Sequence, residues 1–113
     1  MTARNKLLSA PPYPVEQSLK RLGANLRTAR LRRNLTIEEL AAKIGTGVRA
    51  VADAEHGKPS TGIAVYAALL WALDLLRPLA DLAAPERDEE GQTLARARER
   101  ARARPDRGMD NDS

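Results

Sequence analysis

Apolar residues recur along this chain mostly at the spacing of an α-helix. In the first such segment they lie three or four residues apart, at Leu19, Leu22, Leu26 and Ala29. This spacing predicts an amphipathic helix over residues 16–33. The segment before it contains three prolines and has no such period, which predicts a flexible, extended arm over residues 1–15.

The second helix is predicted from signals at both of its ends. Thr36 can cap a helix with its hydroxyl, and Glu39, three residues later, can complete a capping box. Leu35 and Leu40 are placed to pack together as a hydrophobic staple. Gly45 tolerates the left-handed conformation at a helix end, so the helix should end there.

Three more helices are predicted after this turn. One covers residues 47–56, with Val48 and Val51 facing inward, and the next covers residues 62–73, with Ser60 or Thr61 as its cap. The third follows the run of leucines from 75 to 82 and ends at Pro85. Because no strand-like alternation occurs, the expected fold class is all-α.

The last segment, residues 86–113, is rich in charge and in arginine at every second position. Nothing in it can bury a core, so it is predicted to be disordered or an isolated, marginally stable helix. The folded domain is therefore assigned to residues 16–85.

Charge is unevenly distributed along the chain. Residues 1–58 carry 11 Lys/Arg against 5 Asp/Glu, whereas residues 59–90 carry 2 against 6 and residues 91–113 carry 6 against 4. A basic first half fits a surface that binds nucleic acid, although a solvated face fits the charge equally well.

Several function classes are disfavoured by what the sequence lacks. It has no cysteine, no metal-binding spacing, no Gly-rich phosphate loop and one histidine, so neither an enzyme nor a metal or cofactor site is expected. No apolar run approaches the ~20 residues needed to span a bilayer. A cytoplasmic protein that does not bind membranes is expected. Its core, which contains no Phe, is thin, and this favours a homodimer.

A small residue, a glycine and a β-branched residue follow one another at a distinctive spacing: Ala41, Gly45 and Val51. Ala41 lies where the second helix must cross the third closely, and Val51 anchors the third helix against it. This arrangement holds two helices at the steep angle that lets the second project into a major groove.

Residues 26 to about 76 resemble the helix-turn-helix family of phage Cro and C1 repressors, and the motif itself corresponds to residues 37–56. The resemblance is carried by the run from Leu35 to Ala41, by Gly45 and by the segment from Glu55 to Ser60. It implies a λ-repressor-like domain of five helices that binds double-stranded operator DNA. It also implies that Arg30 of the first helix pairs with Glu55 of the recognition helix.

The DNA contacts expected from this resemblance and from residue chemistry are made by Arg32, Arg33, Thr36, Ile37, Lys43, Thr46, Gly47, Val48, Arg49, Ala50, Asp53, Lys58 and Ser60. Among them, Arg49 suits a bidentate contact to guanine. The outward face of the third helix otherwise offers few donors, and its residues are equally credible as plain helix surface. Arg32 and Arg33 are also explained as the cationic end of the first helix.

Residues 70–91, followed by the arginine-rich tail, resemble HipB-like antitoxins, the DNA-binding partners of HipA-type kinase toxins. This resemblance implies a protein that represses its own operon and inhibits a HipA-like kinase toxin. Two alternatives stay open: a protein-binding toxin inhibitor with weak DNA binding, and a stand-alone phage-type repressor.

Two further features of residues 70–91 have open roles. Trp71 is interpreted as a core residue or as an interface anchor. The dimer interface is assigned to Leu75, Leu76, Leu79 and Leu82, which can alternatively cover the core.

Overall fold

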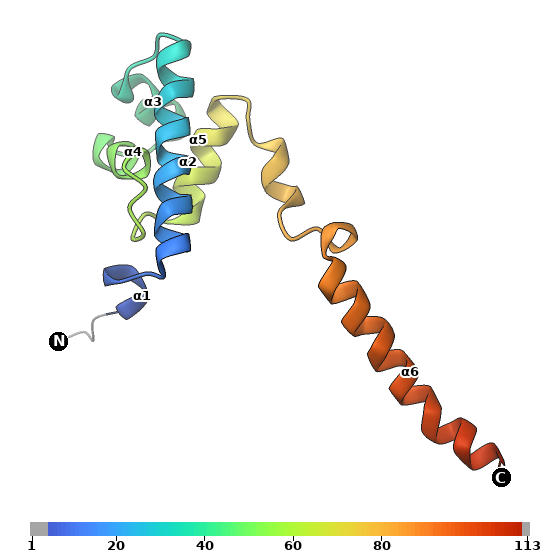
Figure 1. Cartoon of the computed structure of the whole chain (residues 1–113). Coiled ribbons are helices and arrows are strands. Elements are labelled where there is room, and N and C mark those ends of the chain that lie inside the picture. Colours follow the sequence, from blue (N-terminus) through green and yellow to red (C-terminus); the bar gives the residue numbers. More distant parts are fainter. Residues whose placement is uncertain (1–4, 112–113) are drawn as a thin grey trace. The chain divides into compact units, whose positions relative to one another are not determined.

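The computed structural model describes residues 5–111, with side chains through residue 103. It divides into two compact units, one up to Arg77 and one from Pro78 on. All regular elements in the described residues are helical, which confirms the predicted all-α class (Figure 1). None of these helices is both long and apolar enough to cross a membrane.

The first unit contains five α-helices, and α4 contacts three of the others, namely α2, α3 and α5. Their bounds are α1 Lys6–Ser9, α2 Tyr13–Arg32, α3 Ile37–Ile44, α4 Val48–Glu55 and α5 Ile63–Ala72. The buried core comprises Leu26, Ala29, Leu40, Ala41, Val51, Ala54, Tyr66, Leu69 and Leu73. These residues come from α2, α3, α4, α5 and the residue that caps α5, so α1 adds nothing to the core.

The predicted extended arm is wrong over part of its length. Asn5 accepts a hydrogen bond from the Leu7 backbone N–H and begins α1, and α2 begins at Tyr13 rather than at residue 16. Pro12 and Pro14 stand at the cap and in the first turn of α2, where a missing N–H removes no helical hydrogen bond. They therefore mark the start of a helix. Residues 1–4 of the predicted arm lie outside the described residues.

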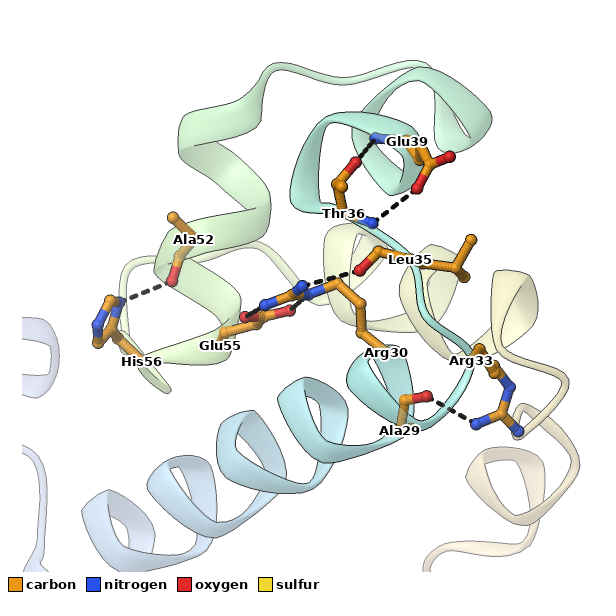
Figure 2. Close-up of polar contacts among 9 residues, drawn as sticks. All are labelled: Ala29, Arg30, Arg33, Leu35, Thr36, Glu39, Ala52, Glu55 and His56. Carbon is orange, nitrogen blue, oxygen red and sulfur yellow. Dashed lines mark hydrogen bonds and ion pairs between the residues drawn. The ribbon is translucent and has the colours of Figure 1, made fainter.

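The predicted start and end of α3 are confirmed. The Thr36 hydroxyl accepts from the Glu39 N–H at 3.0 Å, and the Glu39 carboxylate accepts from the Thr36 N–H at 2.8 Å (Figure 2). Gly45 ends the helix with φ of 77°, in the left-handed region. The start of α3 and the turn that follows it are thus each defined by local chemistry.

The predicted cap of α5 is wrong. Gly62 occupies the cap position, and no side chain caps the helix. Thr61 has turned inward instead, where its Oγ1 is buried with no hydrogen-bond partner among the described residues.

The prediction of a fifth domain helix over the leucines from 75 to 82 is also wrong. The segment forms only a short 3-10 helix, η1, over Arg77–Asp81. Asp74 and Ala83 both have φ of 61°, a left-handed conformation that a right-handed helix cannot include. Asp74 ends α5, with the Leu75 N–H donating back to the Leu70 carbonyl at 2.8 Å.

The second unit contains η2, Pro85–Arg87, and the long helix α6, Glu89–Asn111. Of the two states predicted for residues 86–113, the helical one is present over α6. The Asp88 carboxylate accepts from the Gly91 N–H at 3.0 Å, and two glutamates lie in the first turn. Both features favour the start of a helix.

Candidate nucleic-acid interface

The crossing of α3 and α4 depends on small, fully packed side chains. Ala41 on α3 is 3% exposed and Val51 on α4 is 0% exposed, and both belong to the core. A larger side chain at either position would force the helices apart. The opposite face of α4 is left outside the core.

Arg30 and Glu55 connect α2 to the end of α4 (Figure 2). The Arg30 Nε donates to Glu55 Oε2 at 2.6 Å and Nη2 donates to Oε1 at 3.0 Å, a bidentate pair. A third donor, Nη1, reaches the Leu35 carbonyl at 2.9 Å. The hydrogen bond to Glu55 raises the pKa of Arg30, although burial opposes this. The pair thus fixes α4 against both α2 and the segment that leads into α3.

A second feature, which was not predicted from the sequence, also holds α4 on α2. Gly23 lies in the middle of α2 and is buried, and a Cβ there would stand 2.5 Å from the Ala54 carbonyl oxygen and 2.6 Å from that of Glu55. Gly57, with φ of 67°, approaches the Leu19 backbone equally closely. A glycine inside a helix lowers the stability of that helix. The presence of Gly23 within a predicted helix was therefore the sequence signal that another backbone approaches there.

The exposed face of α4 begins at its first residues. Gly47 is the cap and contributes no side chain, and Val48 is 45% exposed, so its predicted inward orientation is wrong. Val48 lies only three residues before the fully buried Val51, but it belongs to the first turn of α4, which extends beyond the core. Arg49 follows with a side chain that is 85% exposed. This turn is the part of α4 that is free to meet a ligand.

Asp53 forms ion pairs with two cations, Arg49 and Lys58. Its Oδ1 lies 3.7 Å from the Arg49 Nε and 3.7 Å from the Lys58 Nζ. The Asp53 side chain is 28% exposed, and both cations are more open to solvent. Ion pairs this exposed contribute little to stability, so either cation can leave Asp53 at small cost.

The comparisons with known proteins bear on this geometry. The helix-turn-helix family model matches residues 26–75. The match covers α3, the turn and α4 together with all nine residues of the buried core. It supports a DNA-binding regulator of transcription. Neither the curated proteins nor the solved structures gave a significant match.

Within this helix-turn-helix region, most of the predicted DNA-contacting residues lie at the surface. The exposed ones are Arg32, Arg33, Thr36, Lys43, Gly47, Val48, Arg49, Lys58 and Ser60. The half-buried ones are Ile37, Thr46, Ala50 and Asp53.

Arg32 and Arg33 differ from the rest of this set. Both line a shallow hollow together with Asn25 and Leu75, and no residue of α3 or α4 lines it. The Arg33 Nη1 donates to the Ala29 carbonyl at 2.8 Å, on the side of α2 away from Glu55 (Figure 2). Arg33 therefore serves the end of α2, as the alternative interpretation held.

The predicted interface residues are partly exposed. Trp71 is 57% exposed, so its interpretation as a core residue is wrong. In the first unit, Leu75 is 42% exposed and Leu76 is half-buried. In the second unit, Leu79 is half-buried and Leu82 is 69% exposed. These exposed apolar side chains are available for contact with another chain.

Proposed function

We propose that this protein is a transcription regulator that binds operator DNA as a homodimer, with α4 of each subunit in a major groove. The observation that supports this most directly is the orientation of α4. Its inner face is packed on α2 and α3, while Val48 and Arg49 stand outside the core. A major groove about 12 Å wide admits a helix of this kind.

Arg49 is the residue proposed to read sequence. A guanidinium can donate two hydrogen bonds to the O6 and N7 of guanine, the commonest specific contact in the major groove. Val48 and Ala50 are proposed to meet thymine methyl groups. Lys43 and Lys58, together with the Ser60 hydroxyl, are proposed to contact phosphates.

The test begins with selection of bound duplexes from a random-sequence DNA pool, followed by titration of the selected duplex. Arg49→Ala should weaken binding by about 1–3 kcal/mol, or roughly 5- to 150-fold, and relax the preference at one base pair. Arg27→Ala is the matched control, because Arg27 is an exposed arginine of α2 outside the proposed interface. No enrichment of any sequence by the native chain would overturn the proposal.

Homodimerisation is proposed through Leu75, Leu76, Leu79 and Leu82, with Trp71 as an added anchor. Trp71 supports this because it is 57% exposed. A large aromatic side chain at this exposure leaves much apolar surface in contact with water unless another chain covers it. Trp71→Glu should shift the protein to monomer in sedimentation experiments. Tyr13→Glu, which changes another exposed aromatic residue, should not. A native chain that stays monomeric at high concentration would contradict the dimer.

An antitoxin role is the second candidate, and the resemblance of residues 70–91 is what favours it. In this role the protein would repress its own operon and bind a HipA-like kinase toxin. The test is co-expression of the chain with a kinase encoded beside it. The alternative of a toxin inhibitor with weak DNA binding predicts toxin binding that survives Arg49→Ala. A toxin complex lost in that variant would count against this alternative.

A further inference from the structure

Four arginines of α6 are arranged on two opposite flanks of the helix. Arg96, Arg98, Arg100 and Arg102 are all exposed. At about 100° per residue, Arg96 and Arg100 form one flank, and Arg98 and Arg102 form another roughly 160° away around the axis. The every-second-residue spacing thus becomes two separate rows of positive charge.

Small side chains occupy the strip between these two flanks. Ala97 and Ala101 lie there at helical spacing, in line with Leu94. Among the side chains described up to residue 103, nothing long follows Leu94 on this strip, so this part of the helix can approach a ligand closely. The arginines then stand on both sides of the contact.

These arginines have no ion-pair partner among the described side chains. Two like charges four residues apart destabilise an isolated helix, and both flanks contain such a pair. Glu99 is the one acidic residue among them. A ligand with negative charge on two sides would remove this repulsion.

We propose that α6 is a second DNA-binding element that lies in a groove of the duplex and contacts the phosphates of both strands. A major groove about 12 Å wide fits a helix of about 10–12 Å, and it has a phosphate row on each wall. One arginine flank faces each wall, and the alanine strip faces the base edges. With alanines there, α6 adds affinity without sequence preference. The choice of DNA as the partner rests on the proposed function.

The test compares three full-length proteins on a labelled mixed-sequence duplex over a range of salt concentrations. The first is the native chain. The second replaces all four arginines with glutamine, which has a similar helix propensity. The third keeps the composition but moves the two arginines of one flank onto the alanine strip, through Ala97→Arg, Arg98→Ala, Ala101→Arg and Arg102→Ala.

For each chain bound, loss of four phosphate contacts should lower the slope of log affinity against log salt by about 3.6. The advantage of the native chain over the glutamine variant should therefore shrink roughly 100-fold per bound chain between about 50 and 200 mM salt. The rearranged variant should lose about half of the slope difference, because Arg96 and Arg100 still face one wall, whereas the arginines moved to positions 97 and 101 face the base edges. Circular dichroism of the free proteins checks that all three contain the same amount of helix.

Two outcomes would overturn the proposal. Equal slopes for the native and glutamine chains would show that α6 does not touch DNA, as expected if its partner is an acidic protein. Equal binding by the rearranged and native chains would show that charge alone matters. Failure of the proposed function would give a different result. The native chain would show no preference for any selected sequence, while the glutamine variant would still show a smaller slope of log affinity against log salt.

Discussion

Breaking the ion pair between Arg30 and Glu55 should cost a large part of the stability of the first unit. The two side chains are 9% and 5% exposed, so water cannot replace a lost partner. Glu55→Gln keeps the shape of the side chain but leaves the guanidinium beside a neutral amide. Removing one partner of a buried pair costs about 3–5 kcal/mol. At about 0.05–0.15 kcal/mol per residue, a unit of this size has roughly 4–11 kcal/mol in total.

The assay is urea unfolding followed by far-UV circular dichroism, with a double-mutant cycle. Arg30→Met combined with Glu55→Met should recover most of the loss, because an apolar pair of similar volume removes both charges together. About 1 kcal/mol should remain lost, since the Leu35 carbonyl no longer has its donor. Glu16→Gln is the matched control, because Glu16 pairs with Lys20 at 3.6 Å in the solvent. Its expected cost is below about 0.5 kcal/mol.

The reasoning is refuted if Glu55→Gln costs no more than Glu16→Gln. That result would mean that the pair is solvated in the folded protein. The double methionine variant is expected to be more stable than Glu55→Gln, because it leaves no unpaired buried charge. If the two are equally unstable, the unpaired charge is not the source of the cost.

Three other substitutions have defined outcomes. Gly23→Ala should lower the melting temperature, although alanine normally favours helices, because its Cβ would stand 2.5 Å from a backbone carbonyl oxygen of α4. An unchanged melting temperature would mean that α2 and α4 can separate without loss. Asp53→Asn should raise DNA affinity, since the carboxylate holds Arg49 and repels phosphates. Weaker binding to the selected duplex would instead give Asp53 a direct role in base recognition. Burial raises the pKa of Tyr66, so above about pH 10 the unfolded chain loses this proton first and stability falls with rising pH. Tyr66→Phe should reduce that alkaline loss in urea titrations, and an identical pH profile would contradict it.

The sequence was most informative where structure depends on a few adjacent residues. The start of α3 and the turn after it follow from Thr36, Glu39 and Gly45, whose caps form within one helical turn. The pairing of Arg30 with Glu55 spans 25 residues and came instead from the family resemblance.

The misses have identifiable physical causes. α5 consists almost entirely of apolar residues, so its pattern cannot indicate which face is buried, and for that reason a core position and an interface position both stayed open for Trp71. The run of leucines after it favoured a helix, but the left-handed residues Asp74 and Ala83 flank the run and leave room only for a short 3-10 helix. For α6, composition outweighed the local signal of Asp88 followed by two glutamates.

The contact of α2 with α4 through Gly23 and Gly57 also has an evolutionary consequence. Because main-chain atoms define this approach, the tilt of α4 does not depend on the outward side chains of that helix. Substitutions at Val48, Arg49 or Ala50 can accumulate without changing how the helix is presented. Such a scaffold lets a lineage acquire new target sequences while its framework stays constant.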